Sequence, residues 1–183
     1  MPNSSSSQAP ERLLSSDLIL MLLAAATGTK SVRGRLDGIT RLEKLLFLAD
    51  KETSIPSQVA EPFVFQPYDF GPYSKAIYEA VELLEQAGLV REDRAYQGQA
   101  LDSVEEAEAL APEEREGVER RFWLTEDGSA VAAFLSQQHP KVASQLGEIK
   151  AQYGDMPLRR LIRYVYTKYP KYAEASKIRD DVL

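Results

Sequence analysis

Few residues in this 183-residue sequence have the types and spacing that catalysis requires. The chain contains no cysteine, which excludes disulfide scaffolds, thiolate zinc sites and cysteine nucleophiles. Its one histidine, His139, argues against a serine triad and a multi-histidine metal site, because neutral-pH base chemistry relies on that side chain. The tetrapeptide Gly28-Thr29-Lys30-Ser31 lacks the spacing and the preceding strand of a phosphate-binding loop. We therefore expect a binding protein and not an enzyme, with no catalytic residue, cofactor or metal.

The aromatic string YDFGPYS, residues 68–74, is the first candidate binding site. Aromatic side chains with few competing rotamers are the anchors of interface hot spots, and Tyr68 and Tyr73 are the members that we most expect to be exposed. A structural role is the interpretation that we favour for the motif as a whole. In that role the aromatic rings staple the start of a helix, which Asp69 or Ser74 caps.

The helix that follows this string is predicted to expose mainly acidic side chains. A DNA-reading helix presents Arg, Lys, Asn or Gln to the base edges, and a carboxylate that faces phosphate opposes binding. The helix is therefore better suited to a basic partner protein than to the major groove. The partner-binding candidates are Tyr68, Asp69, Tyr73, Lys75, Glu79 and Glu82.

Basic residues form the alternative candidate, a nucleic-acid-binding surface. Residues 28–51 carry six Lys and Arg against three acids (+3), residues 139–183 carry nine against five (+4), and residues 52–138 carry six against 18 (−12). Because the middle block would repel phosphates, any contact with nucleic acid must use the two basic flanks. The alternative candidates are Lys30, Arg33, Arg35, Arg41, Lys44, Arg159, Arg160 and Arg163. For the first five, a solvated helix surface is an equally good explanation.

Four tyrosines are interleaved with the basic residues of the C-terminal part of the sequence: Tyr164, Tyr166, Tyr169 and Tyr172. Aromatic rings among basic residues can stack the bases of single-stranded nucleic acid. We favour the other interpretation, in which the rings pack inward and keep their hydroxyl groups in water.

The first sixteen residues are rich in serine and contain proline, which predicts a disordered tail over 1–16. The apolar run Leu18–Ala26 has nine residues, far fewer than the ~20 that cross a bilayer. A secretory signal is the alternative, but no net positive charge precedes the run. We expect a buried first helix, capped by Ser16 or Asp17, and a cytoplasmic location.

Two further helices are predicted from helical spacing and end signals. Apolar residues from 39 to 49 predict a second helix that ends near Lys51, with Thr40 and Glu43 at the spacing of a capping box. A third helix should begin at or near Gly71-Pro72 and end at Gly88. Between the two, Phe63-Val64-Phe65 could form a short edge strand.

The remaining elements complete the predicted fold. Residues 89–92 and 120–125 have strand composition, and an acidic loop of about 100–119 separates them. The order of helices, strand, long loop and returning strand is that of a winged helix. We therefore predict a mainly α fold: a winged-helix-like domain over 17–138 with a two-stranded β wing, and a helical C-terminal extension of the same domain over 139–183.

Three segments carry a resemblance to known families. GITRLEKLLFLAD (38–50) and FQPYDFGPYSKAIYEAVELLEQAGLV (65–90) resemble the YwgA-like bacterial proteins, and LRRLIRYVYTKYPKYAEAS (158–176) resembles the C-terminal segment of the same group. More distantly, a KLLFLAD helix followed by GP at the head of the next helix is similar to the Panacea domain of SocA-like antitoxins and phage-associated proteins. The resemblance implies a winged-helix-like fold and a small, non-catalytic regulatory or antitoxin-like protein.

We expect a bacterial regulatory protein, antitoxin-like or associated with phage or stress responses, that binds a protein partner such as a toxin or a component of a defence system. Its acidic loop and third helix would meet a basic partner surface. The alternative is a DNA-binding transcriptional regulator that uses the basic second helix and the C-terminal helix, whose patches a dimer would bring together. No membrane contact is expected, and a homo-oligomer is left open.

Overall fold

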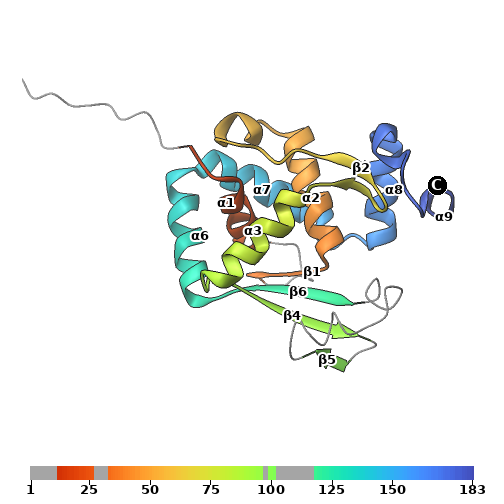
Figure 1. The fold of residues 1–183 in the computed structure, drawn as a ribbon. Helices are drawn as coiled ribbons and strands as arrows, with labels where there is room; N and C mark the ends of the chain where they lie inside the picture. The colour runs from red at the N-terminus through yellow and green to blue at the C-terminus, as the bar shows by residue number, and fades with distance from the viewer. Residues whose placement is uncertain (1–11, 27–32, 97–98, 102–117) are drawn as a thin grey trace, which may run out of the picture.

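The computed structural model describes residues 12–26, 33–96, 99–101 and 118–183. The chain is mainly helical, as predicted, and a small antiparallel sheet lies along one side of the helices (Figure 1). In chain order the elements are α1 (Ser15–Ala24), β1 (Arg35–Asp37), α2 (Ile39–Glu52), η1 (Ile55–Gln58), β2 (Gln66–Tyr68), β3 (Gly71–Tyr73), α3 (Lys75–Gln86), β4 (Val90–Tyr96), β5 (Gln99–Leu101), β6 (Glu119–Leu124), α6 (Glu126–Gln138), α7 (Pro140–Tyr153), α8 (Leu158–Lys168), η2 (Pro170–Ala173) and α9 (Arg179–Val182). Lys30, residues 1–11 of the predicted tail and residues 102–117 of the predicted loop lie outside the described residues.

The predicted tail is wrong at its C-terminal end, because residues 12–16 belong to the folded chain. Leu13 is buried and forms a parallel bridge with Val59. Its backbone N–H donates to Gln58 O at 3.2 Å, and its carbonyl accepts from the N–H of Ala60 at 2.9 Å. The burial of Leu13 and these two backbone hydrogen bonds hold the segment beside η1.

The first helix is buried, as predicted, but it begins earlier than expected. All six residues from Leu18 to Leu23 are buried in α1. The helix begins at Ser15 after Leu14, so neither Ser16 nor Asp17 is the N-cap residue. The Asp17 carboxylate instead reaches back from the first turn and accepts the N–H of Leu14 at 2.8 Å. None of the helices among the described residues is long and apolar enough to span a membrane.

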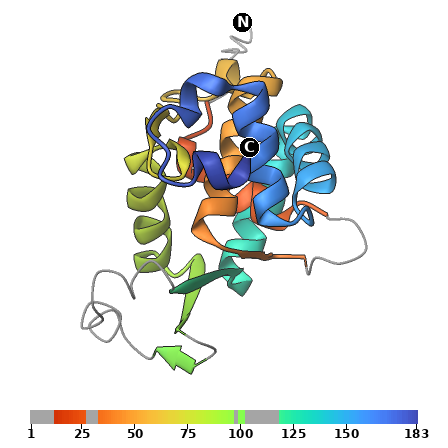
Figure 2. The ribbon, with the colours of Figure 1, turned by 90° about the vertical axis from the view of Figure 1, so that its right-hand side faces the viewer.

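The second helix has the predicted extent but not the predicted cap. Gly38, with a φ of +93°, precedes α2, and Thr40 already lies inside the helix. Every residue from 42 to 49 is buried, because α2 is covered by α7, α8, β1 and β3 on different sides. Glu43 is therefore drawn into the interior and does not reach back to Thr40. In Figure 2, α8 and the segment after it lie over α2.

The sheet contains the two predicted strands and two more. Its order is β1-β6-β4-β5, and all neighbours are antiparallel. In the register of β4 and β6, Val90 pairs with Leu124 and Glu92 with Phe122. The two predicted strands are thus the middle of a four-stranded sheet, to which β1 and β5 add one edge each. The extra strands were not predicted because each has only three residues.

The segment before the third helix differs from prediction. Residues Gly71–Tyr73 form β3, which pairs with β2 in a small second sheet, and α3 begins only at Lys75 after Ser74. The predicted edge strand at 63–65 has no ladder partner. Gly71 has a φ of +93°, and a Cβ atom there would lie 2.6 Å from Cε1 of Tyr166, so the tight turn requires glycine.

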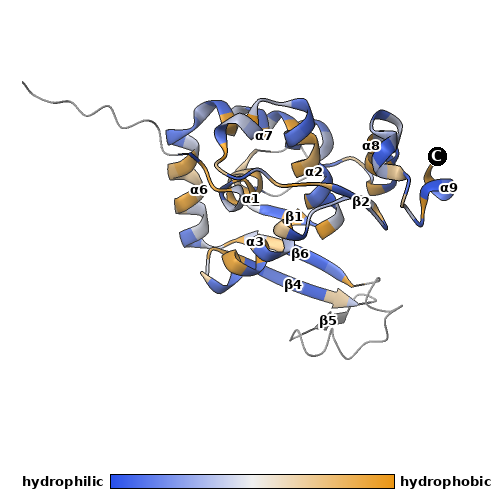
Figure 3. Ribbon diagram, turned by 45° about the horizontal axis from the view of Figure 1, so that its top comes forward, coloured by the Kyte–Doolittle hydropathy of each residue, from blue (hydrophilic) through white to orange (hydrophobic). Residues whose placement is uncertain are grey.

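The C-terminal extension over 139–183 is helical, as predicted, and contains α7, α8, η2 and α9; α6 directly precedes it. Val142 and Leu146 of α7, and Leu161 and Val165 of α8, belong to the same buried cluster as the residues of α1 and α2. Most helices carry both apolar and polar residues (Figure 3). The core is therefore continuous from the first helix to the C-terminal ones.

Candidate partner-binding site

Helix α2 contacts the YDFGPYS string before α3 through two buried charged side chains of the helix, Glu43 and Lys44. Lys44 Nζ donates to the carbonyl of Pro72 at 2.9 Å and lies 3.7 Å from Glu43 Oε2. Glu43 Oε1 in turn accepts the backbone N–H of Ser74 at 3.4 Å. Helix α2 therefore holds the turn between β3 and α3 by its charged groups.

Burial shifts the pKa values of both groups. Desolvation lowers the pKa of Lys44 to about 8, although Glu43 opposes the shift. Desolvation raises the pKa of Glu43, with Lys44, the Ser74 N–H and Arg120 opposing it. Each charge is thus retained in the interior mainly because the other is beside it.

Above this pair lies a row of three tyrosine rings, Tyr68, Tyr73 and Tyr78, which we call the tyrosine row. The Tyr68 and Tyr73 centroids are 4.8 Å apart, and those of Tyr73 and Tyr78 are 5.4 Å apart. Tyr68 is 50% exposed. The rings border a cavity of about 150 Å³ with Glu43 and Lys44 on its inner side, which is roomy enough for water and too small for a large ligand.

A groove continues from Tyr73 along the stretch Phe63–Phe65, which we call the open segment. Side chains alternate along it, with Phe63 buried, Val64 82% exposed and Phe65 half-buried, as in a strand. The rings of Phe63 and Phe65 anchor the segment to the core, 6.4 Å from each other, and Phe65 lies 5.2 Å from Phe47. In the part of the chain that the structure describes, the backbone of the open segment makes no hydrogen bond to other backbone groups.

The groove itself has a volume of about 490 Å³ and lies between the open segment and the start of α3. Its wall includes Pro62, Val64 and Ala76, and its charged groups are Glu61, Lys75 and Glu79. Lys75 is paired with Glu79 at 2.7 Å. The groove therefore combines apolar walls with a small excess of negative charge.

The partner-binding candidates named from the sequence are distributed unevenly. Tyr68 borders the small cavity, and Lys75 and Glu79 border the groove. Tyr73 borders both the small cavity and the groove. Glu82 lies exposed one turn further along α3, where Gln86 Nε2 donates to it at 3.3 Å.

Asp69 and Ser74 do not play the parts that the sequence suggested. Ser74 occupies the N-cap position of α3 but makes no side-chain capping bond. Asp69 faces the C-terminal segment, where its carboxylate lies 2.8 Å from Lys177 Nζ and its carbonyl accepts the N–H of Lys177 at 2.9 Å. Asp69 is thus a tether for the segment after η2 and neither a helix cap nor an exposed contact.

The predicted basic surface around the second helix is largely absent. Lys44 is 1% exposed, so it cannot reach a phosphate. Arg41 is half-buried and donates to the carbonyls of Gly154 and Met156 at 2.9 and 2.6 Å. Arg35 is held by Asp37 at 2.7 Å above the ring of Trp123. Of this group, only Arg33 is exposed among the described residues.

The C-terminal arginines are exposed, but two of them are engaged. Arg159 donates to the carbonyl of Asp181, and Arg163 donates to that of Leu183 at 2.7 Å. Arg160 is exposed. The rings of the four nearby tyrosines pack against the core, as we favoured, and Tyr166 is only 1% exposed. Their hydroxyl groups were expected in water, but those of Tyr164, Tyr166 and Tyr169 form hydrogen bonds within the chain.

A polar cluster around Glu52 was missed by sequence reasoning. Its carboxylate accepts from the hydroxyls of Tyr153, Tyr164 and Tyr169, each at 3.1 Å, and from Lys168 Nζ at 2.8 Å. The only signal in the sequence was the spacing of Tyr164 and Lys168, one helical turn apart. The cluster joins the ends of α2, α7 and α8.

The pKa shifts in this cluster argue for a structural role. Desolvation would raise the pKa of Glu52, but the hydrogen bonds from Lys168 and the tyrosines outweigh it and lower that pKa below its ordinary value. Desolvation and the nearby Glu52 raise the pKa of Tyr169 to about 12. Near neutral pH the carboxylate stays ionised and the tyrosine protonated, so neither is poised to exchange protons. Among the described residues, no group of three or more His, Cys, Asp and Glu side chains could hold a metal ion.

Comparison of the chain with protein-family models and with curated proteins found no match.

Proposed function

We propose that this chain is a non-enzymatic regulatory protein that binds a protein partner through the tyrosine row, the open segment and the start of α3. The observation that carries the proposal is a row of tilted, partly exposed tyrosine rings that continues into an open groove, along backbone that is unpaired among the described residues. Tyrosine rings are frequent interface anchors. The resemblance to YwgA-like and SocA-like antitoxin proteins supports the same class of function.

The open segment favours an extended partner. Its backbone continues directly into β2, and its donors and acceptors, which no backbone group of the described residues pairs with, can form ladder hydrogen bonds with an added strand. Val64 would face the side chains of that strand. The small excess of negative charge in the groove, from Glu61 and Glu79 against Lys75, favours an occupant that carries Lys or Arg.

The same proposal includes a winged-helix-like arrangement of the elements from α1 to β6. It rests on the chain order α1-β1-α2-α3-β4-β6 and on the position of β1 beside β6 in the antiparallel sheet. The partner-binding face then lies at the hairpin before the third helix and at the start of that helix. We propose an antitoxin-like role in the bacterial cytoplasm, with a toxin or defence component as partner.

A DNA-binding regulator is the second candidate, and the arrangement just described is what favours it. The basic surface around α2 gives this candidate little support, because Lys44 is buried and Arg35 and Arg41 form hydrogen bonds within the chain. The outer face of α3 presents Glu79 and Glu82, which would oppose phosphate.

The test is site-specific photo-crosslinking in cells of the source organism. A benzoylphenylalanine at Val64 should trap one protein of defined mass, whereas the same residue at Phe134, which is 60% exposed on α6, should not. Substitution of Tyr68 with alanine should weaken binding of the purified partner about 30-fold or more, as for a hot-spot residue. Equal adducts at both positions would refute the proposal. Retention that nuclease abolishes, and that Arg33→Gln weakens, would favour DNA.

A further inference from the structure

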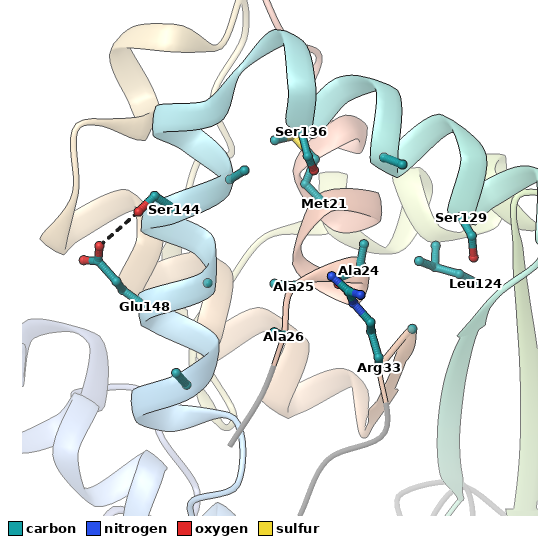
Figure 4. Close-up of a pocket in the computed structure, with 15 residues that line it drawn as sticks. Met21, Ala24, Ala25, Ala26, Arg33, Leu124, Ser129, Ser136, Ser144 and Glu148 are labelled. Carbon is teal, nitrogen blue, oxygen red and sulfur yellow. Dashed lines mark hydrogen bonds between the residues drawn. The ribbon is translucent and has the colours of Figure 1, made fainter. Parts of the chain in front are cut away.

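Helices α6 and α7 form a V with α1 between its arms. Only His139 separates them, and its φ of −125° and ψ of 61° are not helical. Pro140 explains the break, because proline disfavours the helical conformation in the residue before it. Both arms pack on α1, and Figure 4 shows them running apart on either side of its C-terminal end.

Between the arms lies an open cavity of about 940 Å³. Its walls are built from small side chains, which leave the space between the arms unfilled; they include Ala133 and Ser136 of α6 and Ala143, Gly147 and Ala151 of α7. A Cβ atom at Gly147 would meet no atom within 4 Å. Protein interiors are normally packed without such voids, and a cavity of this size suits a small organic ligand.

The cavity has one cationic and one anionic side chain, Arg33 and Glu148, which lie on opposite walls. Arg33 reaches the cavity from the side of β1, where its Nε donates to the carbonyl of Ala24 at 3.3 Å (Figure 4). No carboxylate of the described chain lies within 4 Å of its guanidinium. Glu148 is on the opposite wall, where Ser144 donates to it at 3.3 Å.

A second cation stands behind the cavity. Lys150 is 1% exposed, and its Nζ donates to the carbonyls of Leu23 and Ala25 at 2.7 and 3.1 Å. These bonds satisfy the C-terminal end of α1, so the negative end of that helix is already neutralised. Arg33 Nε also donates to this helix end, and among the described residues the two Nη groups of Arg33 make no hydrogen bond, so they are available for a ligand.

We propose that this cavity binds a small amphipathic carboxylate. The apolar part lies between α6 and α7 against Met21 and Leu124, and the carboxylate is held by the guanidinium of Arg33. A guanidinium binds a carboxylate through two parallel hydrogen bonds, which gives direction as well as affinity. The site is separate from the partner-binding face and does not depend on the proposed function.

The probe is sodium decanoate, titrated into the full chain below its micelle concentration and followed by calorimetry. We expect saturable binding of one molecule per chain. Decyltrimethylammonium, which has the same tail and the opposite charge, should not bind. Equal binding of the two compounds, or no binding of decanoate, would overturn the proposal.

Two variants locate the site. Arg33→Gln should weaken decanoate binding about tenfold, the effect of one charge-assisted hydrogen-bonding group. The matched control Arg160→Gln, at another exposed arginine, should leave it unchanged. Gly147→Leu should abolish binding by filling the cavity, without lowering the melting temperature, because its side chain enters open space. If Arg33→Gln and Arg160→Gln have the same effect, or if Gly147→Leu still binds decanoate, the cavity is not the site.

Discussion

Replacing Lys44 with methionine tests whether the buried pair with Glu43 holds the turn before α3. The ammonium group neutralises Glu43 at 3.7 Å and satisfies the carbonyl of Pro72 at 2.9 Å. Removal of one partner of a buried pair costs about 3–5 kcal/mol, because the other charge is left uncompensated. The expected loss for Lys44→Met lies at the lower end. Glu43, whose pKa burial already raises, can take up a proton.

A second substitution, Glu43→Gln, removes the carboxylate that Lys44→Met leaves without its partner. Lys44→Met leaves the buried carboxylate of Glu43 without its partner, whereas in the double variant neither residue of the pair carries a charge. We therefore expect the double variant to be more stable than Lys44→Met alone by at least about 1.5 kcal/mol.

The assay is urea unfolding at pH 7, followed by far-UV circular dichroism, for all four members of the cycle. Lys150→Met is the matched control, because Lys150 is equally buried but donates to carbonyls and not to a carboxylate. Glu43→Gln should combine additively with it, within about 0.5 kcal/mol. A loss below about 0.5 kcal/mol for Lys44→Met, or no rescue by Glu43→Gln, would refute the reasoning.

Three further predictions concern the pH dependence of stability, the turn at Gly71 and the cluster around Glu52. The folded pKa values of Lys44 and Lys150 are about 8, below the ordinary 10.5, so the unfolded chain holds more protons than the folded chain between these two values. The free energy of unfolding should therefore rise from pH 7.5 to 9.5, and Lys44→Met should remove about half of the rise. Gly71→Ala should lower stability by about 2–3 kcal/mol in urea unfolding, through its positive φ and the contact with Tyr166; an unchanged midpoint would contradict the turn geometry. Glu52→Gln should lower stability by about 1–2 kcal/mol at pH 7, and the difference from wild type should shrink below pH 4.5, where the carboxylate with its lowered folded pKa becomes protonated.

Periodicity and end signals were sufficient for the longer elements. Apolar spacing and end signals predicted α2 and α3, although α3 begins at Lys75 and not at Gly71-Pro72, and the strand composition around Val90 and Phe122 predicted β4 and β6. These patterns are local consequences of chain geometry, so one sequence is enough to reveal them. Strands of three residues, such as β1 and β5, carry too little pattern to be predicted.

The candidate site was predicted only in part. Tyr68, Tyr73, Lys75 and Glu79 lie together at the groove and the small cavity, as the string before the third helix suggested. The open segment was expected to be a paired edge strand, because its alternation is strand-like. Whether a strand finds a ladder partner depends on what lies beside it, which the local sequence does not contain.

The sequence alone determined that this chain has a mainly helical fold with a helix-to-strand unit, a histidine-poor and cysteine-free chemistry, and an acidic middle section. Only the tertiary structure decided which charges are available. Lys44 and Arg41 have the same side chains as exposed basic residues, but α2 is covered on several sides, and their charges are committed to Pro72, Gly154 and Met156. Exposure is a property of the packed elements around a residue, and no spacing within one helix can supply it.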